Sequence, residues 1–325
     1  MDIRTSNKIT YLYLMMSGMI FYLHGVVIDR YDVAEWVIYL NRFTRVLCNV
    51  SVPTFFFVSA MLLYRKINRK YDDLILNRVK TLLVPYLAWS IILTVVRMLK
   101  GEYTVKTFTS FLFDLMMAKN NSVLWFLRVL FICILLFPVL KRLIKYKWVC
   151  FATIVFVILI NVWIGATVGY STVRYWLPVY ILGAYVGMNS WDNMFSRKFF
   201  REKWKYGLVI FIVLCLVLLG TISEVGLYVC RMLCPILFWI LADVFMIQRR
   251  PSVWMKQNFF FYCSQLLVTS IASKLHIVIF GNKCMSAVLA TLSIPVLMFF
   301  ILILLYSTIE KFAPRLTSIL TGMRS

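Results

Sequence analysis

The sequence contains repeated apolar stretches about as long as an α-helix that crosses a lipid bilayer. A hydrocarbon layer about 30 Å thick takes roughly 20 apolar residues in helical form. Hydrophobic residues make up 62% of the 325 residues and charged residues only 15%. A soluble core of this size does not require so apolar a composition. The sequence therefore predicts an all-α integral membrane protein.

Ten such stretches follow one another, which predicts about ten transmembrane helices in one bundle. Two of them, 48–64 and 175–190, are short. No soluble domain, Pro/Gly-rich linker or internal repeat is evident, so residues 1–325 are expected to form a single transmembrane domain. The stretches cover residues 9–28, 48–64, 81–98, 122–140, 148–166, 175–190, 206–220, 226–247, 258–280 and 285–306.

The net charge of the chain is +22, from 35 Lys and Arg against 13 Asp and Glu. Such an excess is typical of proteins that bind nucleic acid or anionic lipid, and also of a topology signal in loops. With the N-terminus inside, most basic residues fall in alternate loops on the inner side, as the positive-inside rule describes. This predicts that both termini are cytoplasmic. It argues against a nucleic-acid partner, because the basic residues do not gather on one face.

Other polar residues are expected to have structural roles. Asp243 lies near the cytoplasmic end of its apolar stretch and is expected to pair with Arg249 or Arg250. The eight cysteines lie mostly in the apolar stretches and do not have the spacing of metal ligands, so no metal is expected. They are Cys48, Cys133, Cys150, Cys215, Cys230, Cys234, Cys263 and Cys284.

His24 lies in the apolar run IFYLHGVV of the first stretch. An ionisable side chain at mid-membrane costs a few kcal/mol on insertion scales, so it requires a partner, a cavity or a task. From the start of the stretch, His24 lies about 22 Å along the helix, which is in the outer half of the bilayer. One interpretation is a neutral imidazole bonded to a neighbouring helix. The other is a general base reached from the outer side.

Two arginines lie within the stretches, and each has two interpretations. Arg128 is about four residues inside the outer boundary, so its side chain can extend to the interface. Alternatively, it is a fixed positive charge that holds an anionic group or orients a substrate near His24. Arg231 lies at a similar depth on another helix, and the same two interpretations apply to it.

The loop between the second and third stretches is strongly basic. Topology and lipid phosphates account for its charge. Arg78 and Lys80 nevertheless stand at the entrance of the third stretch, where they can hold the phosphates of a cytosolic cofactor. On the outer side, segments 35–43 and 105–120 are amphipathic and are expected to lie along the interface.

Six blocks of the sequence, in order, resemble the membrane acyltransferase-3 family. The order of the blocks makes the resemblance specific, and it runs through most of the chain. The blocks are FYLHGVV, VPTFFFVSAMLLYRK, NRVKTLLVPYLAW, LWFLRVLFICILLFPVL, YWLPVYILGAYVGM and the ending FAPRLTSILTGMRS.

The resemblance implies a ten-span protein of the bacterial cytoplasmic (inner) membrane that O-acylates glycans. Its donor would be cytosolic acyl-CoA, usually acetyl-CoA, and its acceptor a hydroxyl of a cell-surface or lipid-linked glycan. His24 matches the catalytic histidine of the family, as a base or as an acyl carrier. Arg78 and Lys80 match the basic pair linked to the cofactor phosphates, and Arg128 matches an arginine of the W-F-L-R variant.

Two positions depart from the family pattern. Tyr13 stands where an arginine is usual, eleven residues before His24, and Gln265 stands where many members have histidine. Glutamine still donates and accepts hydrogen bonds, but tyrosine does not replace a permanent cation. These departures keep a rival class open. It comprises a non-catalytic membrane protein of polysaccharide assembly and a transporter of a glycan or a lipid-linked intermediate.

Overall fold

The structure is a computed structural model that describes residues 3–65, 70–190, 203–245 and 250–323. These residues form helices and no sheet; one isolated bridge joins Asp32 to Lys283. The first eight α-helices are α1 (Ile3–Gly25), α2 (Glu35–Cys48), α3 (Ser51–Tyr64), α4 (Tyr71–Arg78), α5 (Val84–Leu99), α6 (Phe108–Met116), α7 (Trp125–Leu135) and α8 (Phe137–Lys145). The others are α9 (Lys147–Ile164), α10 (Val173–Met188), α11 (Lys203–Ile222), α12 (Glu224–Phe245), α13 (Asn258–Phe280), α14 (Cys284–Phe312) and α15 (Pro314–Leu320). Short helical turns are η1 (Ile28–Arg30), η2 (Val79–Leu83), η3 (Ser122–Leu124) and η4 (Val253–Gln257).

Within the described ranges, seven helices are long and apolar enough to cross a membrane. They are Glu35–Tyr64, Tyr71–Leu99, Lys147–Ile164, Trp204–Ile222, Glu224–Asp243, Val253–Phe280 and Cys284–Phe312. Helices α7 and α8 also pass together but are bent by 64° at their junction. The prediction of an all-α integral membrane protein is confirmed. All ten apolar stretches contain a helix, and the count of ten spans stays a prediction.

Helix α2 differs from the prediction that residues 35–43 lie along the outer interface. Only Asn49 and Val50 separate α2 from α3, and the two helices together form one 30-residue candidate span. Segment 105–120 contains α6, which begins with a capping box between Thr107 and Ser110. An amphipathic sequence alone did not show that α2 is continuous with the apolar helix that follows it.

Two prolines explain the changes in helical structure at the start of α5 and at the junction of α7 with α8. Proline lacks an amide hydrogen, so it is tolerated in the first turn of a helix and interrupts the hydrogen bonds of a helix that precedes it. Pro85 lies in the first turn of α5, directly after η2, a five-residue π-helical turn. Pro138 lies in the first turn of α8, at the bend. The π turn changes the direction of side chains between α4 and α5.

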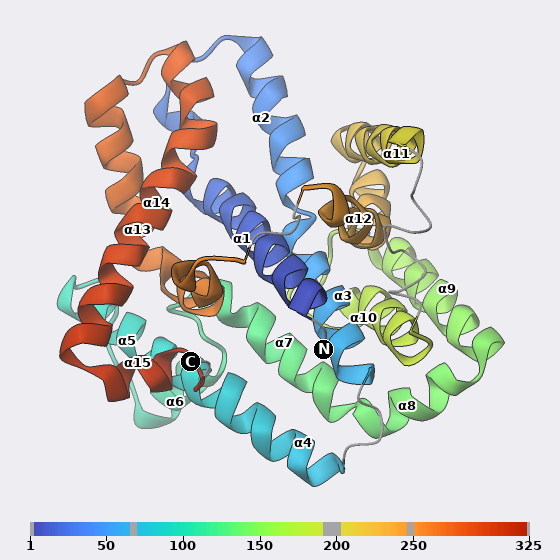
Figure 1. Ribbon diagram of the computed structural model, residues 1–325. Coiled ribbons are helices and arrows are strands. Elements are labelled where there is room, and N and C mark those ends of the chain that lie inside the picture. The colour runs from blue at the N-terminus through green and yellow to red at the C-terminus, as the bar shows by residue number, and fades with distance from the viewer. Residues whose placement is uncertain (1–2, 66–69, 191–202, 246–249, 324–325) are drawn as a thin grey trace.

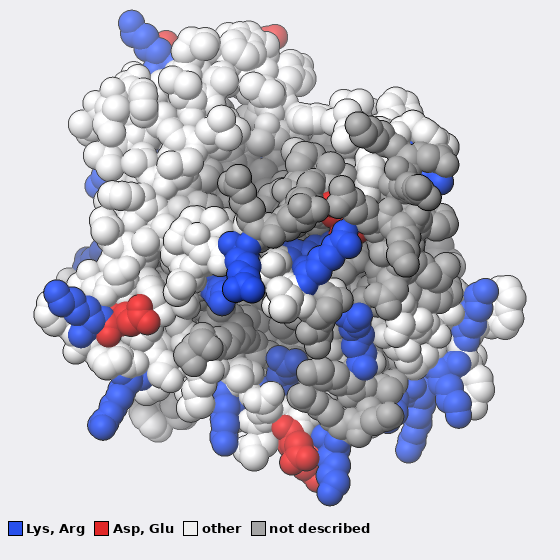
Figure 2. Space-filling model, in the orientation of Figure 1, with Lys and Arg blue, Asp and Glu red and all other residues white. Residues whose placement is uncertain are grey.

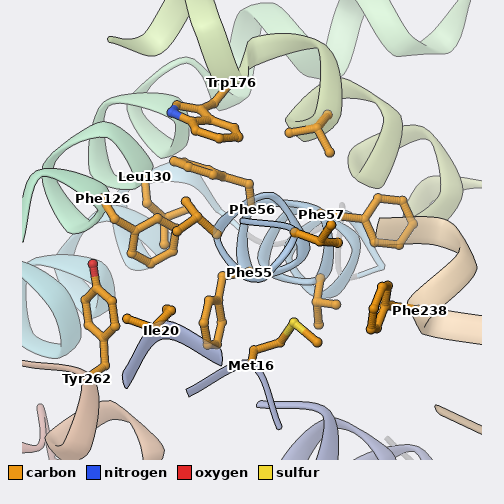
Figure 3. Packing of buried hydrophobic residues seen from close by; sticks show 14 of the residues in the cluster. Met16, Ile20, Phe55, Phe56, Phe57, Phe126, Leu130, Trp176, Phe238 and Tyr262 are labelled. Carbon is orange, nitrogen blue, oxygen red and sulfur yellow. The ribbon is translucent and has the colours of Figure 1, made fainter. Parts of the chain in front are cut away.

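Helices α3 and α10 pack at backbone contact in the centre of the bundle. A Cβ atom added at Gly183 would collide with the carbonyl oxygen of Phe57, and one added at Gly187 would collide with that of Met61. Small residues four apart let two helices approach closely where lipid provides no hydrophobic drive for their association. The close packing fixes α3 against α10, and α3 also carries Phe55 into the core, as Figure 3 shows.

The two ends of the described chain lie on the same side of the bundle. In Figure 1 both ends are in the lower half, whereas the α13–α14 turn and the start of α2 lie at the top. The Trp89 indole of α5 donates to the Leu320 carbonyl of α15 at 3.2 Å. At the opposite side, the Asp32 amide donates to the Asn282 carbonyl at 2.9 Å. The termini therefore share a side, and its assignment to the cytoplasm stays a prediction.

Basic side chains are distributed unevenly over the molecule. On the face shown in Figure 2 most Lys and Arg side chains lie around the centre and along the lower edge, where Figure 1 places α4 and α8. The upper part of this face carries few of them. This separation follows the loop alternation expected from the sequence.

Asp243 pairs with Lys8, which corrects the expectation that it pairs with Arg249 or Arg250. The Lys8 ammonium lies 2.9 Å from the Asp243 carboxylate, and their side chains are only 7% and 10% exposed. The ammonium also lies 4.0 Å from the centre of the Trp239 ring. Arg250 is exposed, and Arg249 lies outside the described residues. The partner, Lys8, lies on the first helix, far from Asp243 in the sequence. The residues that neighbour Asp243 in the sequence therefore did not indicate it.

Candidate functional site

His24 lies in the last turn of α1, at the end opposite the N-terminus. Helix α1 ends one residue later, at Gly25. The His24 side chain is exposed and lines a cavity of about 370 Å³. Residues of α1, α2, α3, α7, α12 and α13, together with Asn49, η3 and the α9–α10 loop, form the walls. We call this space the His24 cavity.

Two arginines line the His24 cavity, and none of the lining residues is acidic. Arg45 comes from the end of α2 and donates from Nη1 to the Val26 carbonyl at 3.3 Å, just beyond the end of α1. Its guanidinium is close enough to the His24 imidazole to act on it electrostatically. Arg231 comes from α12. The charge that these side chains present to the cavity is therefore positive.

Arg231 is held by neutral groups. Its Nη1 donates to the Tyr175 hydroxyl at 2.7 Å and its Nη2 to Asn49 Oδ1 at 2.9 Å. Its guanidinium carbon lies 4.8 Å from the centre of the Tyr170 ring. Tyr170 belongs to the α9–α10 loop, and burial raises the pKa of its hydroxyl to about 12, so this ring is neutral beside the cation. Only 6% of Arg231 is exposed, which excludes an extended side chain at the interface.

Arg128 does not line the His24 cavity. Its Nη1 donates to the Met117 carbonyl at 3.3 Å and lies 2.8 Å from the Met117 sulfur. Trp125, three residues earlier on α7, does line the cavity. The structure therefore does not bring Arg128 together with His24, and Arg231 supplies the buried guanidinium instead.

A second cavity, of about 240 Å³, lies beside Arg78. We call it the Arg78 cavity. Its walls are mostly leucine, isoleucine and phenylalanine side chains, and its uncharged polar members are Tyr13, Ser59, Asn258 and Tyr262. Lys80 is exposed and does not line it. Residues two apart on a helix do not share a face, which explains why Arg78 and Lys80 separate.

Tyr262 of α13 lines both cavities. Its hydroxyl donates to the carbonyl of Val123 in η3. Its ring centre lies 5.6 Å from that of Phe126 and 6.3 Å from that of Phe55. Figure 3 shows these three rings together, with Ile20 of α1 beside Tyr262. The two cavities are therefore adjacent, and an aromatic wall stands between them.

The two departures from the family pattern are both close to this wall. Tyr13 lines the Arg78 cavity, with its ring centre 4.8 Å from that of Phe55. It precedes His24 by eleven residues on α1, which corresponds to about 16 Å along the helix. Gln265 is fully buried, and its Nε2 donates to the Tyr262 carbonyl at 2.9 Å. Gln265 lines neither cavity but contacts the backbone of the residue that lines both.

Sequence reasoning missed several residues of these cavities, among them Arg45, Asn49, Tyr170 and Tyr262. Nothing in the sequence sets Arg45 apart from the other basic residues of the chain. Tyr170 belongs to a loop without a recognisable motif. In the described part of the chain, no group of three or more His, Cys, Asp or Glu residues is placed to hold a metal ion.

The fold and the two cavities define a class of protein. The chain is a multi-pass, all-α membrane protein whose helices enclose an imidazole in one cavity and an arginine in the adjacent cavity. The family follows from the sequence comparison. Residues 13–320 match the family model described as an acyltransferase domain, so the chain belongs to the acyltransferase-3 family, as the six blocks predicted. Its general function is that of a membrane acyltransferase. No curated protein and no solved structure matches the chain.

Proposed function

We propose that the protein transfers an acyl group, acetyl in the simplest case, from cytosolic acyl-CoA to a hydroxyl of a cell-surface or lipid-linked glycan. The observation that carries this proposal is the shared wall of two cavities, one with His24 and the other with Arg78. The reaction takes place in the bacterial cytoplasmic membrane, with both termini in the cytoplasm. Residues 1–325 act as one transmembrane domain.

The Arg78 cavity suits the donor. A guanidinium binds phosphate groups through several donors in a fixed geometry, so Arg78 holds phosphates of the CoA moiety. The pantetheine arm is narrow and uncharged, so it enters the cavity without the cost of burying a charge. Its two amides require hydrogen-bond partners there, and Tyr13, Ser59 and Asn258 line the cavity. Lys80, exposed at the same end, attracts the anionic donor without a fixed contact. The thioester reaches His24 when the Tyr262 side chain moves aside.

The His24 cavity suits the acceptor and the chemical step. His24 accepts the proton of the acceptor hydroxyl, whose oxygen attacks the thioester carbonyl carbon. A C–O bond forms and the C–S bond breaks. The proton passes from the imidazole to the departing thiolate, so CoA leaves as a thiol. In the alternative route a His24 nitrogen forms the bond to the acyl carbon as the C–S bond breaks, and the imidazole proton goes to the CoA thiolate. The acceptor hydroxyl then forms the C–O bond as the C–N bond breaks, and its proton returns to the imidazole.

The donor site is tested by CoA binding. Replacement of Arg78 by glutamine is expected to weaken the affinity for acetyl-CoA at least tenfold, because charge-assisted hydrogen bonds to phosphate contribute about 1.5–3 kcal/mol. Lys80→Gln is expected to have a smaller effect that fades at high salt, since it acts through solvent. Binding is measured by calorimetry on the purified full-length protein.

Lys147→Gln is the matched control for the donor site. Lys147 is an exposed cation at the start of α9 and does not line the Arg78 cavity. Its replacement removes one positive charge of the protein without touching the cavity. If Arg78→Gln, Lys147→Gln and the unmodified protein bind acetyl-CoA with equal affinity, Arg78 does not hold the donor. It would then contribute only to the membrane topology.

The reaction as a whole is tested by mass spectrometry of surface glycans from cells with and without the protein. We expect that cells lacking it will lose an acyl group from one glycan while the amount of that glycan stays the same. A transporter or an assembly subunit would instead change the amount of glycan and leave the acylation of each remaining chain intact. That second result would favour the rival class.

A further inference from the structure

We propose that the acceptor carries a negatively charged group, a carboxylate or a phosphate, which binds in the His24 cavity against Arg231 and Arg45. This inference rests on the proposed function, since it names the chemical class of the acceptor. It begins from the charges on the cavity wall. Two guanidinium groups face this space, and none of its lining residues is acidic.

Arg231 is a buried cation without a carboxylate partner among the described residues. It is 6% exposed, and its hydrogen-bond acceptors are the neutral Tyr175 hydroxyl and Asn49 amide oxygen. A buried charge that lacks an opposite charge is costly, at several kcal/mol even after relaxation. An anionic ligand in the adjoining cavity would offset that cost, whereas a neutral sugar would not.

The guanidinium also has hydrogen-bonding capacity to spare. Arginine has five N–H donors, and the two hydrogen bonds of Arg231 use only two of them. Its Nε also has no hydrogen-bond partner, but it is buried, so a ligand in the cavity is expected to meet the Nη groups. The remaining Nη donors suit the oxygens of a planar carboxylate or a tetrahedral phosphate. Arginine binds such groups through paired hydrogen bonds.

Asn49 links the Arg231 guanidinium to the backbone of α2 at Arg45. Its Oδ1 accepts from Arg231, and its Nδ2 donates to the Arg45 carbonyl at 2.8 Å. Arg45 in turn contacts the chain just after His24, through the Val26 carbonyl. These contacts connect Arg231 with the chain segment that follows His24, so we expect an anion bound to Arg231 to lie near the imidazole. Its neighbouring hydroxyl is presented to His24, which makes Arg231 a residue that determines acceptor specificity.

Binding to the purified full-length protein tests this inference without any donor. The probes are methyl glucuronide and methyl galacturonide, each compared with the neutral methyl glucoside or methyl galactoside that differs only at the carboxylate. The corresponding methyl glycoside 6-phosphates form the phosphate arm. We expect at least one anionic probe to bind about tenfold more tightly than its neutral counterpart, and the better arm identifies the charged group.

Variants assign the preference to the arginines. Arg231→Gln is expected to remove the tenfold preference, and Arg231→Lys to retain part of it. Arg45→Gln is a second variant for the case in which Arg231→Gln folds poorly, because Arg45 is only half-buried. It is expected to weaken anion binding severalfold. Arg42→Gln is the matched control, because Arg42 is exposed on α2, three residues from Arg45, and lines no part of the cavity.

Two binding results would overturn the inference. One is equal binding, or equal absence of binding, of anionic and neutral probes to the unmodified protein. The other is a preference that persists in both Arg231→Gln and Arg45→Gln, which would leave Arg231 as a link between helices only. Acyl transfer to a neutral glycan with no anion preference would refute this inference alone. Anion binding without any acyl transfer would refute the proposed reaction alone.

Discussion

Replacing His24 by alanine is expected to lower the rate of acyl transfer by a factor of about 10²–10⁴. A positioned general base contributes an acceleration of this order, and His24 is the only imidazole, carboxylate, thiol or amine among the described residues that line the His24 cavity. The measurement is the release of CoA thiol from acetyl-CoA by the purified protein, together with acyl content of the surface glycan in cells. Transfer at an undiminished rate would remove His24 from the mechanism.

The second histidine of the chain provides the control for this experiment. His276 of α13 is buried, and its two ring nitrogens lie 3.0 Å from Ser286 Oγ and 2.7 Å from Ser293 Oγ, both on α14. It lines neither cavity. His276→Ala is expected to lower the stability of the protein, because it breaks this link between α13 and α14. The folded fraction should retain its rate of transfer, in contrast to His24→Ala.

The largest expected loss of stability follows from breaking the buried ion pair between Lys8 and Asp243. Removing one partner leaves a buried charge unpaired, which typically costs about 3–5 kcal/mol. We therefore expect Asp243→Asn to destabilise the protein by that order, measured as the midpoint of unfolding in detergent. The double variant Lys8→Met with Asp243→Leu removes both charges, and it is expected to regain most of the lost stability.

A surface pair gives the contrast for that measurement. Arg97 and Glu102 lie 4.0 Å apart, with side chains 41% and 54% exposed. Water and salt screen such pairs, so Glu102→Gln is expected to change stability little. Similar losses for Glu102→Gln and Asp243→Asn would show that burial does not strengthen the Lys8–Asp243 pair. A double variant as unstable as the single one would show that the helices require the charges themselves.

The helices were predictable because the signal for them is local. About 20 consecutive apolar residues define a span wherever they occur in the chain, and each of the ten predicted stretches contains a helix. His24 was recognisable for the same reason, since an ionisable group stands out in such a run. Arg78 and Lys80, in contrast, were expected to act as a pair, and the structure separates them because residues two apart on a helix do not share a face.

The composition of the cavities was not predictable in this way. Arg231 and Asn49 are 182 residues apart in the chain and form a hydrogen bond only because α12 packs beside the α2–α3 junction. Helices of uniformly apolar character carry little information about which face meets which neighbour. For this reason the sequence indicated that Arg231 was unusual but did not identify its partners. It gave no indication that Tyr262 lies between two cavities.

The aromatic wall has a consequence for the cell that hosts this protein. In the proposed topology the Arg78 cavity opens toward the cytosol and the His24 cavity toward the outside. A permanent opening between them would let water and protons leak, and the electrochemical gradient across the membrane would fall. In that topology the Tyr262 ring, held by Val123 and packed against Phe126, would serve as a seal as well as a partition. Each turnover must admit the thioester past it without admitting the solvent.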